Sequence, residues 1–197
     1  MPLRAQRYAL AWPQPDGLLQ AVEPTPDEVR AAAPLLAGWY NEPVNRALLT
    51  NQTLLGAAEV AAHFDDLWAA GDRPLLLLRD SQLIGDCDLR HLEPDRAEYA
   101  ILVGARELQA RGLGSRFTAM VLALAFGPLG LSRVYASVVP ENQGSLRMFE
   151  KLGFAVDGSP EARRYAEAPE EICLSLAAES LRAARPEVFA QVRISLR

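Results

Sequence analysis

The chain contains very few residues of the types that bind metals or form imines. Its 197 residues include two cysteines and two histidines, and these show no repeated C-x-x-C or histidine spacing typical of a zinc site. Cys87 and His91 lie close enough in the sequence to share a metal, although two isolated core or surface residues are the simpler interpretation. Lys151 is the only lysine. The composition therefore argues against a metal centre and against Schiff-base chemistry.

Long apolar runs are also missing. No stretch approaches the roughly 20 apolar residues that a membrane-spanning helix requires. Near the N-terminus, the apolar segment from Tyr8 to Trp12 is ended by Pro13 and is too short for the hydrophobic region of a signal peptide. We therefore expect a cytoplasmic protein that does not bind membranes.

Positive charge is scarce as well. Asp and Glu number 25 against 20 Lys and Arg, which leaves a net charge of −5. This balance does not favour a nucleic-acid partner, and it is compatible with a cationic substrate. Half of the residues are hydrophobic and 23% are charged, as in ordinary globular proteins. The length fits one domain, which we place at residues 1–197, with a core at about 18–178 and a C-terminal extension at 179–197.

Apolar periodicity, turn residues and helix caps predict a continuous order of elements. An antiparallel meander of three strands is followed by a strand-helix-strand crossover, which must be right-handed and places a parallel pair in the middle of the sheet. The sequence therefore predicts an α+β fold with a mixed, mostly antiparallel sheet flanked by helices. The expected elements are a strand at 18–22, helices at 26–39 and 57–70, strands at 74–79, 83–89 and 97–103, a helix at 113–127, a strand at 133–139, a helix at 142–152, and strands at 154–157 and 172–177.

The C-terminal tail, residues 180–197, carries the apolar side chains Val188, Phe189, Val192 and Ile194. Apolar residues in a terminal extension need a surface to cover. The tail is therefore expected to cover an edge of the sheet or to pair with another subunit, and both a monomer and a homodimer remain open.

A loop with two glycines joins the third strand of the meander to a long apolar helix. Glycines at such a junction let backbone N–H groups approach an anion, and the helix N-terminus adds unpaired donors and a partial positive charge. The loop lacks the Lys-Ser/Thr pair of a P-loop, and Phe117 stands where a dinucleotide-binding fingerprint needs a third glycine. On the glycines alone, a pyrophosphate site and a plain turn are equally open. The loop reads Gln109-Ala110-Arg111-Gly112-Leu113-Gly114-Ser115-Arg116, and its arginines are placed to neutralise phosphate charge.

Two motifs resemble those of the GNAT superfamily of N-acetyltransferases. The pattern Gln109-x-x-Gly112-x-Gly114 resembles the Q/R-x-x-G-x-G/A motif that binds the pyrophosphate of acyl-CoA. Residues 142–154 read NQGSLRMFEKLGF and resemble the family's N-x-x-S…E-K-x-G-F motif. The resemblance covers roughly residues 18–178 and is closest to ribosomal-protein-alanine N-acetyltransferase-like enzymes. It implies a GNAT-like sheet with splayed central strands, and acetyl-CoA as the cosubstrate.

The resemblance also implies where the cofactor lies. Its pantetheine arm is expected in the gap beside the strand at 133–139, paired with the backbone of Ile101, Leu102 and Val103. Asn142 is expected to contact this arm, to cap the helix that follows it, or to do both. The full expected cofactor set is Ile101, Leu102, Val103, Gln109, Ala110, Arg111, Gly112, Leu113, Gly114, Ser115, Arg116, Asn142, Ser145 and Phe149.

Acyl transfer to an amine needs a group that takes a proton from the amine and a group that assists the departing thiolate. Glu98 is the expected base, because it lies in an R-A-E-Y-A segment that resembles the family's A-E-I-G segment; the alternative is a strand glutamate paired with Arg96 or Arg90. Many family members carry a tyrosine acid where this chain has Phe149, which has no proton to donate. Ser145, one helical turn earlier, is the expected substitute, as a proton relay or as a hydrogen-bond donor to the sulfur.

Together these features predict an N-acetyltransferase that moves an acetyl group from acetyl-CoA to a primary amine by direct attack in a ternary complex. The acceptor stays open among a protein N-terminus, a free amino acid, a polyamine and an amine-bearing antibiotic. The absence of the tyrosine acid at Phe149 keeps open a non-catalytic acyl-CoA-binding regulatory module. A nucleotide-binding module of another fold is the third alternative.

Overall fold

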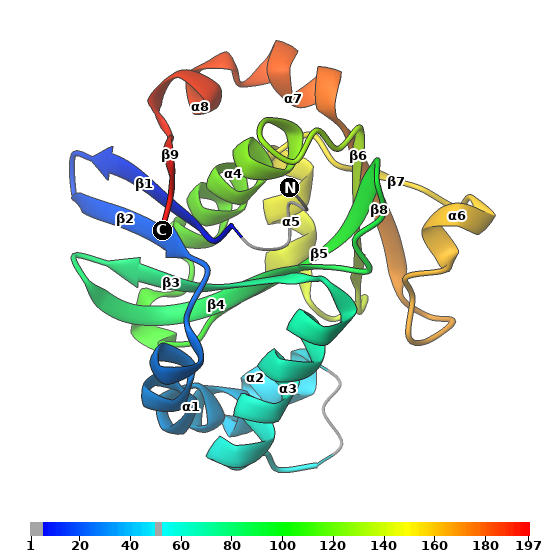
Figure 1. The fold of residues 1–197 in the computed structure, drawn as a ribbon. Coiled ribbons are helices and arrows are strands. Elements are labelled where there is room, and N and C mark those ends of the chain that lie inside the picture. The colour runs from blue at the N-terminus through cyan, green and yellow to red at the C-terminus, as the bar shows by residue number, and fades with distance from the viewer. Residues whose placement is uncertain (1–5, 50–52) are drawn as a thin grey trace.

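One mixed sheet runs through the centre of the protein (Figure 1). The computed structural model describes residues 6–49 and 53–197. Its strands are β1 (Tyr8–Gln14), β2 (Gly17–Val22), β3 (Arg73–Arg79), β4 (Gln82–Arg90), β5 (Arg96–Val103), β6 (Arg133–Val138), β7 (Ala155–Val156), β8 (Ile172–Ala177) and β9 (Arg193–Leu196). Its helices are α1 (Pro26–Asn41), α2 (Pro43–Leu48), α3 (Ala57–Ala70), α4 (Leu113–Phe126), α5 (Gln143–Lys151), α6 (Pro160–Arg163), α7 (Ala178–Ala184) and α8 (Pro186–Gln191), with a short 3-10 turn at Arg106–Leu108.

The strand order is β7-β8-β6-β5-β4-β3-β2-β1-β9. Every neighbouring pair is antiparallel except β5 and β6, which are parallel and connected through α4. This arrangement confirms the predicted α+β fold with a mixed, mostly antiparallel sheet. The parallel pairing runs only from Arg96↔Arg133 to Glu98↔Tyr135. Beyond Glu98, β5 continues without β6 as its partner, so the centre of the sheet opens on one side.

Helices cover both faces of the sheet (Figure 1). On one face, α1 and α3 pack against each other and against β4 and β3, and Val29, Leu36 and Phe64 belong to a small core there. On the other face, α4 packs against β1, β2, β5 and β6, while α5 and α8 pack against α4. The open part of β5 therefore lies between two separately packed layers.

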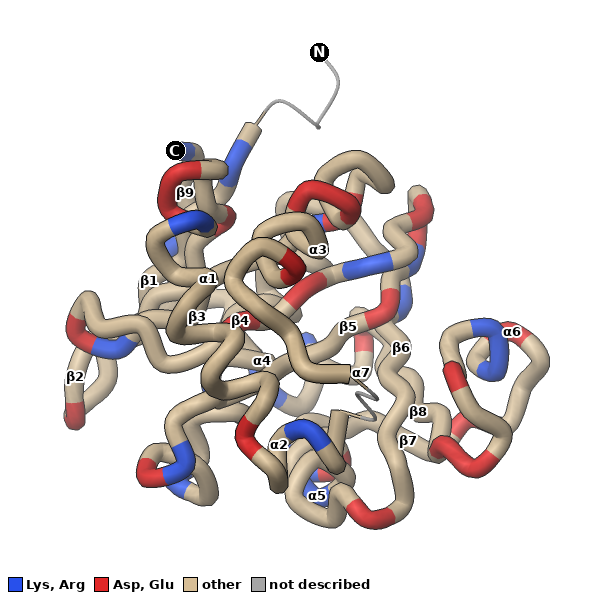
Figure 2. The backbone as a smooth tube through the Cα atoms, turned by 90° about the horizontal axis from the view of Figure 1, so that it is seen from below, with Lys and Arg blue, Asp and Glu red and all other residues tan. Residues whose placement is uncertain are grey.

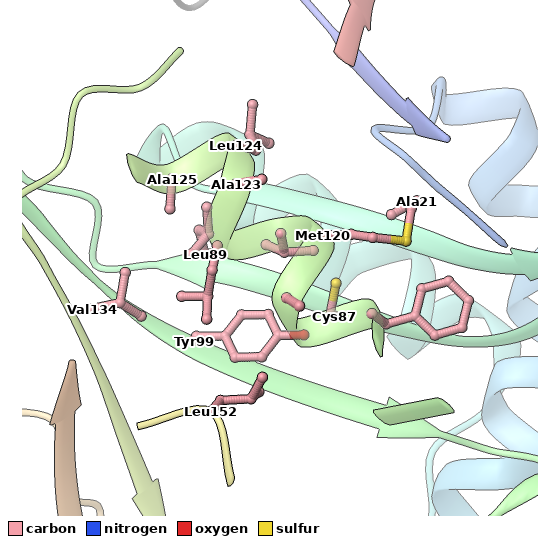
Figure 3. Packing of buried hydrophobic residues seen from close by; sticks show 14 of the residues in the cluster. Ala21, Cys87, Leu89, Tyr99, Met120, Ala123, Leu124, Ala125, Val134 and Leu152 are labelled. Atoms are coloured by element: carbon pink, nitrogen blue, oxygen red, sulfur yellow. The ribbon is translucent and has the colours of Figure 1, made fainter. Parts of the chain in front are cut away.

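The main core is built around α4. All of its residues from Phe117 to Phe126 are buried, as expected for a helix that is enclosed on every side. Figure 3 shows Tyr99 and Cys87 of the sheet beside Met120 of this helix, all within the same core. Because burying one large apolar side chain contributes about 1.5–3 kcal/mol, this layer holds β5 and the start of α4 in a stable relative position.

The helix signals near the N-terminus act as the sequence predicts. The N-cap Thr25 and Glu28 form a capping box, in which Glu28 N donates to Thr25 Oγ1 at 3.3 Å and Thr25 N donates to Glu28 Oε2 at 2.7 Å. Pro26 opens α1, and the helix continues past an internal Pro34 to Asn41. It thus ends beyond Trp39, the predicted limit, because the next proline is not reached until Pro43.

The sequence prediction lacked six of these helices and strands, of which β1 and α2 come first in the chain; the others are α6, α7, α8 and β9. The segment that is too short for a signal peptide forms the strand β1, in which alternate residues Tyr8, Leu10 and Trp12 are buried. The helix α2 follows α1 after a single residue, Glu42, whose carboxylate caps it. Both elements are short, and their apolar patterns are too brief to indicate a structure without the neighbours that they contact.

The C-terminal tail completes the sheet within the same chain. Strand β9 pairs antiparallel with β1, from Tyr8↔Leu196 to Ala11↔Arg193. Val188 of α8 is fully buried against the main core. Of the two roles expected for the tail, the structure therefore shows that it covers a sheet edge. The strand predicted at 154–157 is correct in place but is only two residues long.

Charged residues of both signs gather around α6 (Figure 2). Arg96 Nη1 lies 2.8 Å from Glu161 Oε1, and Arg164 Nη2 lies 3.0 Å from Glu93 Oε1. Partly exposed ion pairs contribute about 0–1 kcal/mol each. They therefore orient α6 next to the β4–β5 turn more than they stabilise the fold.

None of the described helices is long and apolar enough to cross a membrane. Within residues 6–49 and 53–197, no group of three or more His, Cys, Asp or Glu side chains is arranged to hold a metal ion. Cys87 is free and buried in the core, whereas the side chain of His91 is 61% exposed. These two residues do not form a site together.

Candidate active site

Two cavities adjoin each other beside the open part of β5. The first, of about 530 Å³, we call the loop cavity; its lining includes Gln109, Gly112, Gly114, Asn142, Arg147 and Lys151. The second, of about 400 Å³, we call the acidic cavity; its lining includes Tyr40, Glu59, Asp86, Asp88, Arg90 and Glu98. The residues common to both are Leu48, Leu49, Ile101, Leu102, Asn142 and Ser145. A molecule bound in one cavity can therefore meet a molecule bound in the other.

The wall between the cavities is the free edge of β5. Residues 101–103 pair with β4 on one side, from Ile101↔Cys87 to Val103↔Gly85. On the other side, none of the described strands pairs with them. An unpaired strand edge presents N–H and C=O groups to any extended chain that is laid beside it. The predicted gap between the central strands is thus present at the predicted residues.

The glycine loop leads into an uncapped helix. Gly112 is the N-cap of α4 and has φ 74°, a left-handed conformation that glycine adopts without strain. Because glycine has no side chain with which to cap the helix, the first N–H groups of α4 stay available to an anion. Gly114 and Ser115, in the first turn, line the loop cavity. The loop therefore has the backbone features that a pyrophosphate site needs.

Gly114 also has a packing role that the motif did not indicate. A Cβ atom at this position would lie 3.0 Å from Met148 Sδ. The missing side chain therefore lets α4 and α5 approach closely, and this approach brings the start of both helices to the loop cavity.

The structure brings most of the predicted cofactor residues together. Leu113 is 1% exposed and packs in the core. Phe149 lines the acidic cavity but not the loop cavity, and Arg111 and Arg116 line neither cavity. The predicted residues that line the loop cavity are Ile101, Leu102, Val103, Gln109, Ala110, Gly112, Gly114, Ser115, Asn142 and Ser145.

The positive charge at the loop cavity comes from different residues than expected. Arg116 donates to both carboxylate oxygens of Asp16, at 2.7 and 3.2 Å, and these bonds lower the pKa of Asp16. Arg147 and Lys151 of α5 line the loop cavity instead. They are spaced i, i+4 on one helix face, a signal that was readable once α5 was recognised but that sequence reasoning did not use.

Gln109 fastens the loop to the end of β5. Its Nε2 donates to Val103 O at 2.8 Å and to Asn45 Oδ1 at 3.0 Å. Asn45 of α2 is 2% exposed, and its own amide donates to Trp39 O at 3.0 Å and to Gly104 O at 3.3 Å. The side chain of Gln109 thus positions the loop, and Asn45 is a positioning residue that was missed because α2 was not predicted.

The acidic cavity owes its charge to the alternation of β4. Successive side chains of a strand point to opposite faces, so Asp86, Asp88 and Arg90 share the face that is turned away from α4. Burial is the main cause that raises the pKa of both Asp86 and Asp88 to about 7. The hydroxyl of Tyr40 donates a hydrogen bond to Asp86 Oδ2. The carboxylates that line the cavity are Glu59, Asp86, Asp88, Glu98, Glu167 and Glu171.

Glu98, the predicted base, lies in this cavity and is 1% exposed. Arg90 donates to both of its oxygens, from Nε to Oε2 at 2.9 Å and from Nη2 to Oε1 at 3.1 Å, and His91 Nδ1 contacts Oε2 at 3.0 Å. The pairing with Arg90 that the sequence left open as an alternative is therefore present. Glu98 therefore pairs with Arg90 and also lines the acidic cavity.

The start of α5 contributes to both cavities. Asn142 caps the helix, because its Oδ1 accepts from Ser145 N at 3.1 Å. Phe149 is 3% exposed and packs edge-to-face against Tyr99, with ring centroids 6.3 Å apart. Ser145 thus lies on the wall between the cavities, whereas Phe149 is a core residue with one edge at the acidic cavity.

Tyr165 was not predicted as a site residue but also lines the acidic cavity. Its ring stacks on Tyr135 at a centroid distance of 4.9 Å, and its buried hydroxyl has no hydrogen-bond partner among the described residues. Burial raises its pKa to about 12. The residue follows α6 in an irregular segment, where no periodic pattern could have placed it against β6.

Comparison with known proteins decides the family. Residues 22–155 match the sequence profile described as acetyltransferase (GNAT) domain. The chain belongs to the GNAT acetyltransferase family. The family predicted from the two motifs is thereby confirmed.

Sequence relatives of this GNAT chain match over limited segments. It is 31% identical over 90 residues to alpha/beta-tubulin-N-acetyltransferase 9 of Mus musculus, and this matched segment covers 44% of this chain and 36% of that protein. It is 35% identical over 63 residues to spermidine N(1)-acetyltransferase of Escherichia coli K12, which covers 32% and 33% of the two chains. The chain thus spans about a third of the length of the curated relatives it matches.

Solved GNAT structures are similar over nearly the whole chain. RimJ of Mycobacterium smegmatis in complex with CoA-disulfide has a TM-score of 0.73 at 17% identity, with 94% of this chain and 96% of that chain covered. At this identity the similarity establishes the fold alone.

Proposed function

We propose that the protein transfers an acetyl group from acetyl-CoA to a primary amine by direct attack in a ternary complex. The observation that carries this proposal is the free edge of β5, which borders both cavities. A thioester laid along this edge from the loop cavity is open to a nucleophile in the acidic cavity. Membership of the GNAT acetyltransferase family supports the same reaction.

The loop cavity suits acetyl-CoA. The uncapped start of α4 offers N–H groups to the pyrophosphate, and Arg147 and Lys151 offer two positive charges to the phosphates. The backbone of residues 101–103 offers both donors and acceptors to the amides of the pantetheine arm. Acetyl-CoA supplies an acyl group activated as a thioester, and the residues of this chain bind and orient it.

The acid and base roles belong to the wall of the acidic cavity. Glu98 takes the proton from the acceptor ammonium group, directly or through water, while Arg90 and His91 hold its carboxylate in one orientation. As the C–N bond forms and the C–S bond breaks, the nitrogen releases its second proton to solvent. The Ser145 hydroxyl donates a hydrogen bond to the departing sulfur and passes it a proton that solvent replaces. Ser145 suits this role because it borders both cavities.

A non-catalytic acyl-CoA-binding module is the second candidate. Phe149 stands where many relatives have a tyrosine acid, and its ring is packed in the core. The pairing of Glu98 with Arg90 also supports this candidate, because a carboxylate engaged on both oxygens is less free to accept a proton.

Thiol release from acetyl-CoA separates the candidates. The acceptor panel contains a peptide with a free N-terminus, a free amino acid, spermidine and an aminoglycoside, because the acceptor is open among these classes. Release that depends on one of these amines supports the enzyme. Tight CoA binding without release from any of them supports the binding module. The third alternative, a nucleotide-binding module of another fold, is excluded because the chain belongs to the GNAT family and has its fold.

A cytoplasmic location, the absence of nucleic-acid and membrane partners, and a monomeric or homodimeric state belong to the same proposal. The tail supports the monomer, since β9 covers the edge of β1 that a second subunit would otherwise pair with. Light scattering of the purified protein tests this point directly.

A further inference from the structure

The acidic cavity has a large surplus of negative charge. Six carboxylates line it, and Arg90 is the only arginine or lysine among its described lining residues. Arg90 is already engaged, because it donates to both oxygens of Glu98. Its Nη2 also lies 3.8 Å from Glu167 Oε1. Arg90 is therefore shared by Glu98, Glu167 and Asp88. Within the described part of the chain, Glu59, Asp86 and Glu171 have no ion-pair partner.

Among the buried carboxylates of this cavity, Asp86 and Asp88 are the two with an oxygen that lacks a hydrogen-bond donor. They are 5% and 9% exposed, and no described residue donates a hydrogen bond to Oδ1 of either one. Arg90 Nε lies 3.8 Å from Asp88 Oδ1, which is beyond hydrogen-bond distance. Leaving a buried carboxylate oxygen without a donor costs free energy. A ligand that carries hydrogen-bond donors would therefore satisfy both oxygens.

Both aspartates lie one strand away from the edge at which acetyl transfer is proposed. In the ladder between β4 and β5, Asp86 is opposite Leu102 and Asp88 is opposite Ala100. Neighbouring strands are about 4.8 Å apart, and the free edge of β5 is the one turned away from β4, so an acetyl group beside Leu102 lies about two strand spacings from β4. The two carboxylates are therefore roughly 8–10 Å from that acetyl group. At that distance they reach a cation that is several bonds away from the reacting nitrogen.

We propose that Asp86 and Asp88 bind a second cationic group of the acceptor, which makes the preferred acceptor a diamine or polyamine. This inference rests on the proposed function, since the first amine reacts at the edge of β5. This distance, less the contact distances at the two ends of the molecule, corresponds to roughly three to five methylene groups between the two nitrogens. Tyr40 holds Asp86 in place through its hydroxyl. A second ammonium group supplies the donors that Asp86 and Asp88 lack, and it balances part of the charge of the cavity.

Two amines of equal size test the proposal. n-Pentylamine and 1,4-diaminobutane differ only in that a terminal methyl group of the first is an ammonium group in the second. Thiol release from acetyl-CoA measures kcat/KM for each amine, and calorimetry with CoA present measures the binding of each amine. We expect the wild-type protein to prefer the diamine by about 10- to 100-fold, the factor expected for hydrogen bonds to charged groups.

Variants then assign the preference to these residues. The double variant Asp86→Asn/Asp88→Asn keeps the shape of the cavity and should reduce the preference to less than about threefold, since each amide keeps an oxygen acceptor but loses its charge. Asp65→Asn is the control, because Asp65 is exposed on α3 and does not line the cavity. CoA affinity serves as the test that each variant is folded.

Each outcome decides the matter. If the wild-type protein shows the same kcat/KM and the same affinity for the two amines, the second-cation site is excluded, and no variant is needed for this conclusion. A preference that survives in the double variant, with turnover of both amines equally reduced, makes the aspartates proton acceptors and overturns their role as an anchor. Selective binding of the diamine that the double variant loses, without any thiol release from the wild type, keeps the site and rejects the acetyl transfer.

Discussion

The partner of each charged side chain decides what that side chain can do in this site. Arg116 is held by Asp16 at the β1–β2 turn and is not available to a phosphate in the loop cavity. Glu98 is fully paired, whereas Asp86 and Asp88 each keep an oxygen that no described residue satisfies. Side chains of the same charge therefore differ in role: a paired carboxylate such as Glu98 is held in one orientation, whereas Asp86 and Asp88 are proposed to bind a ligand.

Replacing Glu98 by Gln tests its role as the base. We expect turnover to fall by about 10²-fold or more, because general-base assistance is of that size, while the affinity for acetyl-CoA stays unchanged. The acidic limb of the pH profile should flatten. Glu170→Gln is the control, since Glu170 is exposed and does not line the cavity. A Glu98→Gln protein with normal turnover at every pH would leave Glu98 as a structural partner of Arg90.

Replacing Ser145 by Ala tests assistance to the leaving thiolate. We expect turnover to fall more than the KM for acetyl-CoA rises, which is the signature of an interaction made mainly in the transition state. The cap from Asn142 uses the backbone N–H of Ser145, so the helix start should persist.

A second substitution completes this test. Phe149→Tyr in the Ser145→Ala protein should partly restore turnover, because the new hydroxyl projects from the same helix face one turn further on. The effect should be modest, since Phe149 is 3% exposed and a thiolate is already a good leaving group. If Ser145→Ala turns over like the wild type and Phe149→Tyr changes nothing, the thiolate departs without help from α5.

At the scale of secondary-structure elements, the site depends on how α4, α5 and β5 end or begin. The loop between β5 and α4 is closed by Gly112 in a left-handed conformation and is fastened to β5 by Gln109. The start of α5 is fixed by Asn142. Each terminus leaves backbone groups free at the same place, so the proposed cofactor site is formed largely by main chain.

The variant Gly112→Val tests this main-chain site. A β-branched residue at φ 74° costs about 1–2 kcal/mol of stability, and its side chain obstructs the approach of a pyrophosphate to the loop. We expect CoA binding to be lost while the fold persists, as measured by calorimetry and circular dichroism. Gly130→Val is a matched control, because Gly130 has φ 69° and open space around it but does not line the loop cavity. Equal CoA affinity in the two variants would contradict the cofactor assignment.

At the scale of the whole molecule, the packed layers enclose two buried carboxyl groups whose burial affects the stability of the fold. Asp86 and Asp88 lie between the α1–α3 layer and the sheet, and burial is the main cause that raises the pKa of each from 3.8 to about 7. Between these two pH values the folded protein holds protons that the unfolded chain has released. The stability that they provide is present at low pH and is lost as the pH rises through about 7.

Urea unfolding at two pH values measures this dependence. Relative to the double variant Asp86→Asn/Asp88→Asn, the wild-type protein should lose about 2 kcal/mol of unfolding free energy for each aspartate between about pH 5.5 and 8. Groups elsewhere in the protein titrate in both proteins alike, so only the difference between the two curves is informative. Parallel curves would show that the two carboxyl groups titrate normally in the folded state.

Much of the fold and of the cofactor site could be predicted, because the relevant signals are local. A capping box at Thr25 and Glu28 or a helix cap at Asn142 depends on residues within one helical turn. The glycine loop and the alternation of the strands are equally short-range. The order of the main elements followed from such signals, whereas the family and the open edge at residues 101–103 followed from the resemblance of the two motifs.

The pairing of the charged side chains depended on contacts that no short segment contains. Arg116 meets Asp16 from 100 positions away, and Asp86 and Asp88 face α1 only because the sheet register turns that side of β4 toward it. The local sequence by itself determined most of the main elements and the turn and helix start at the glycine loop, since caps and periodicity act within a few residues. Only the tertiary structure decided which charges are paired and which remain open to a substrate, because pairing depends on how distant strands and helices are brought together.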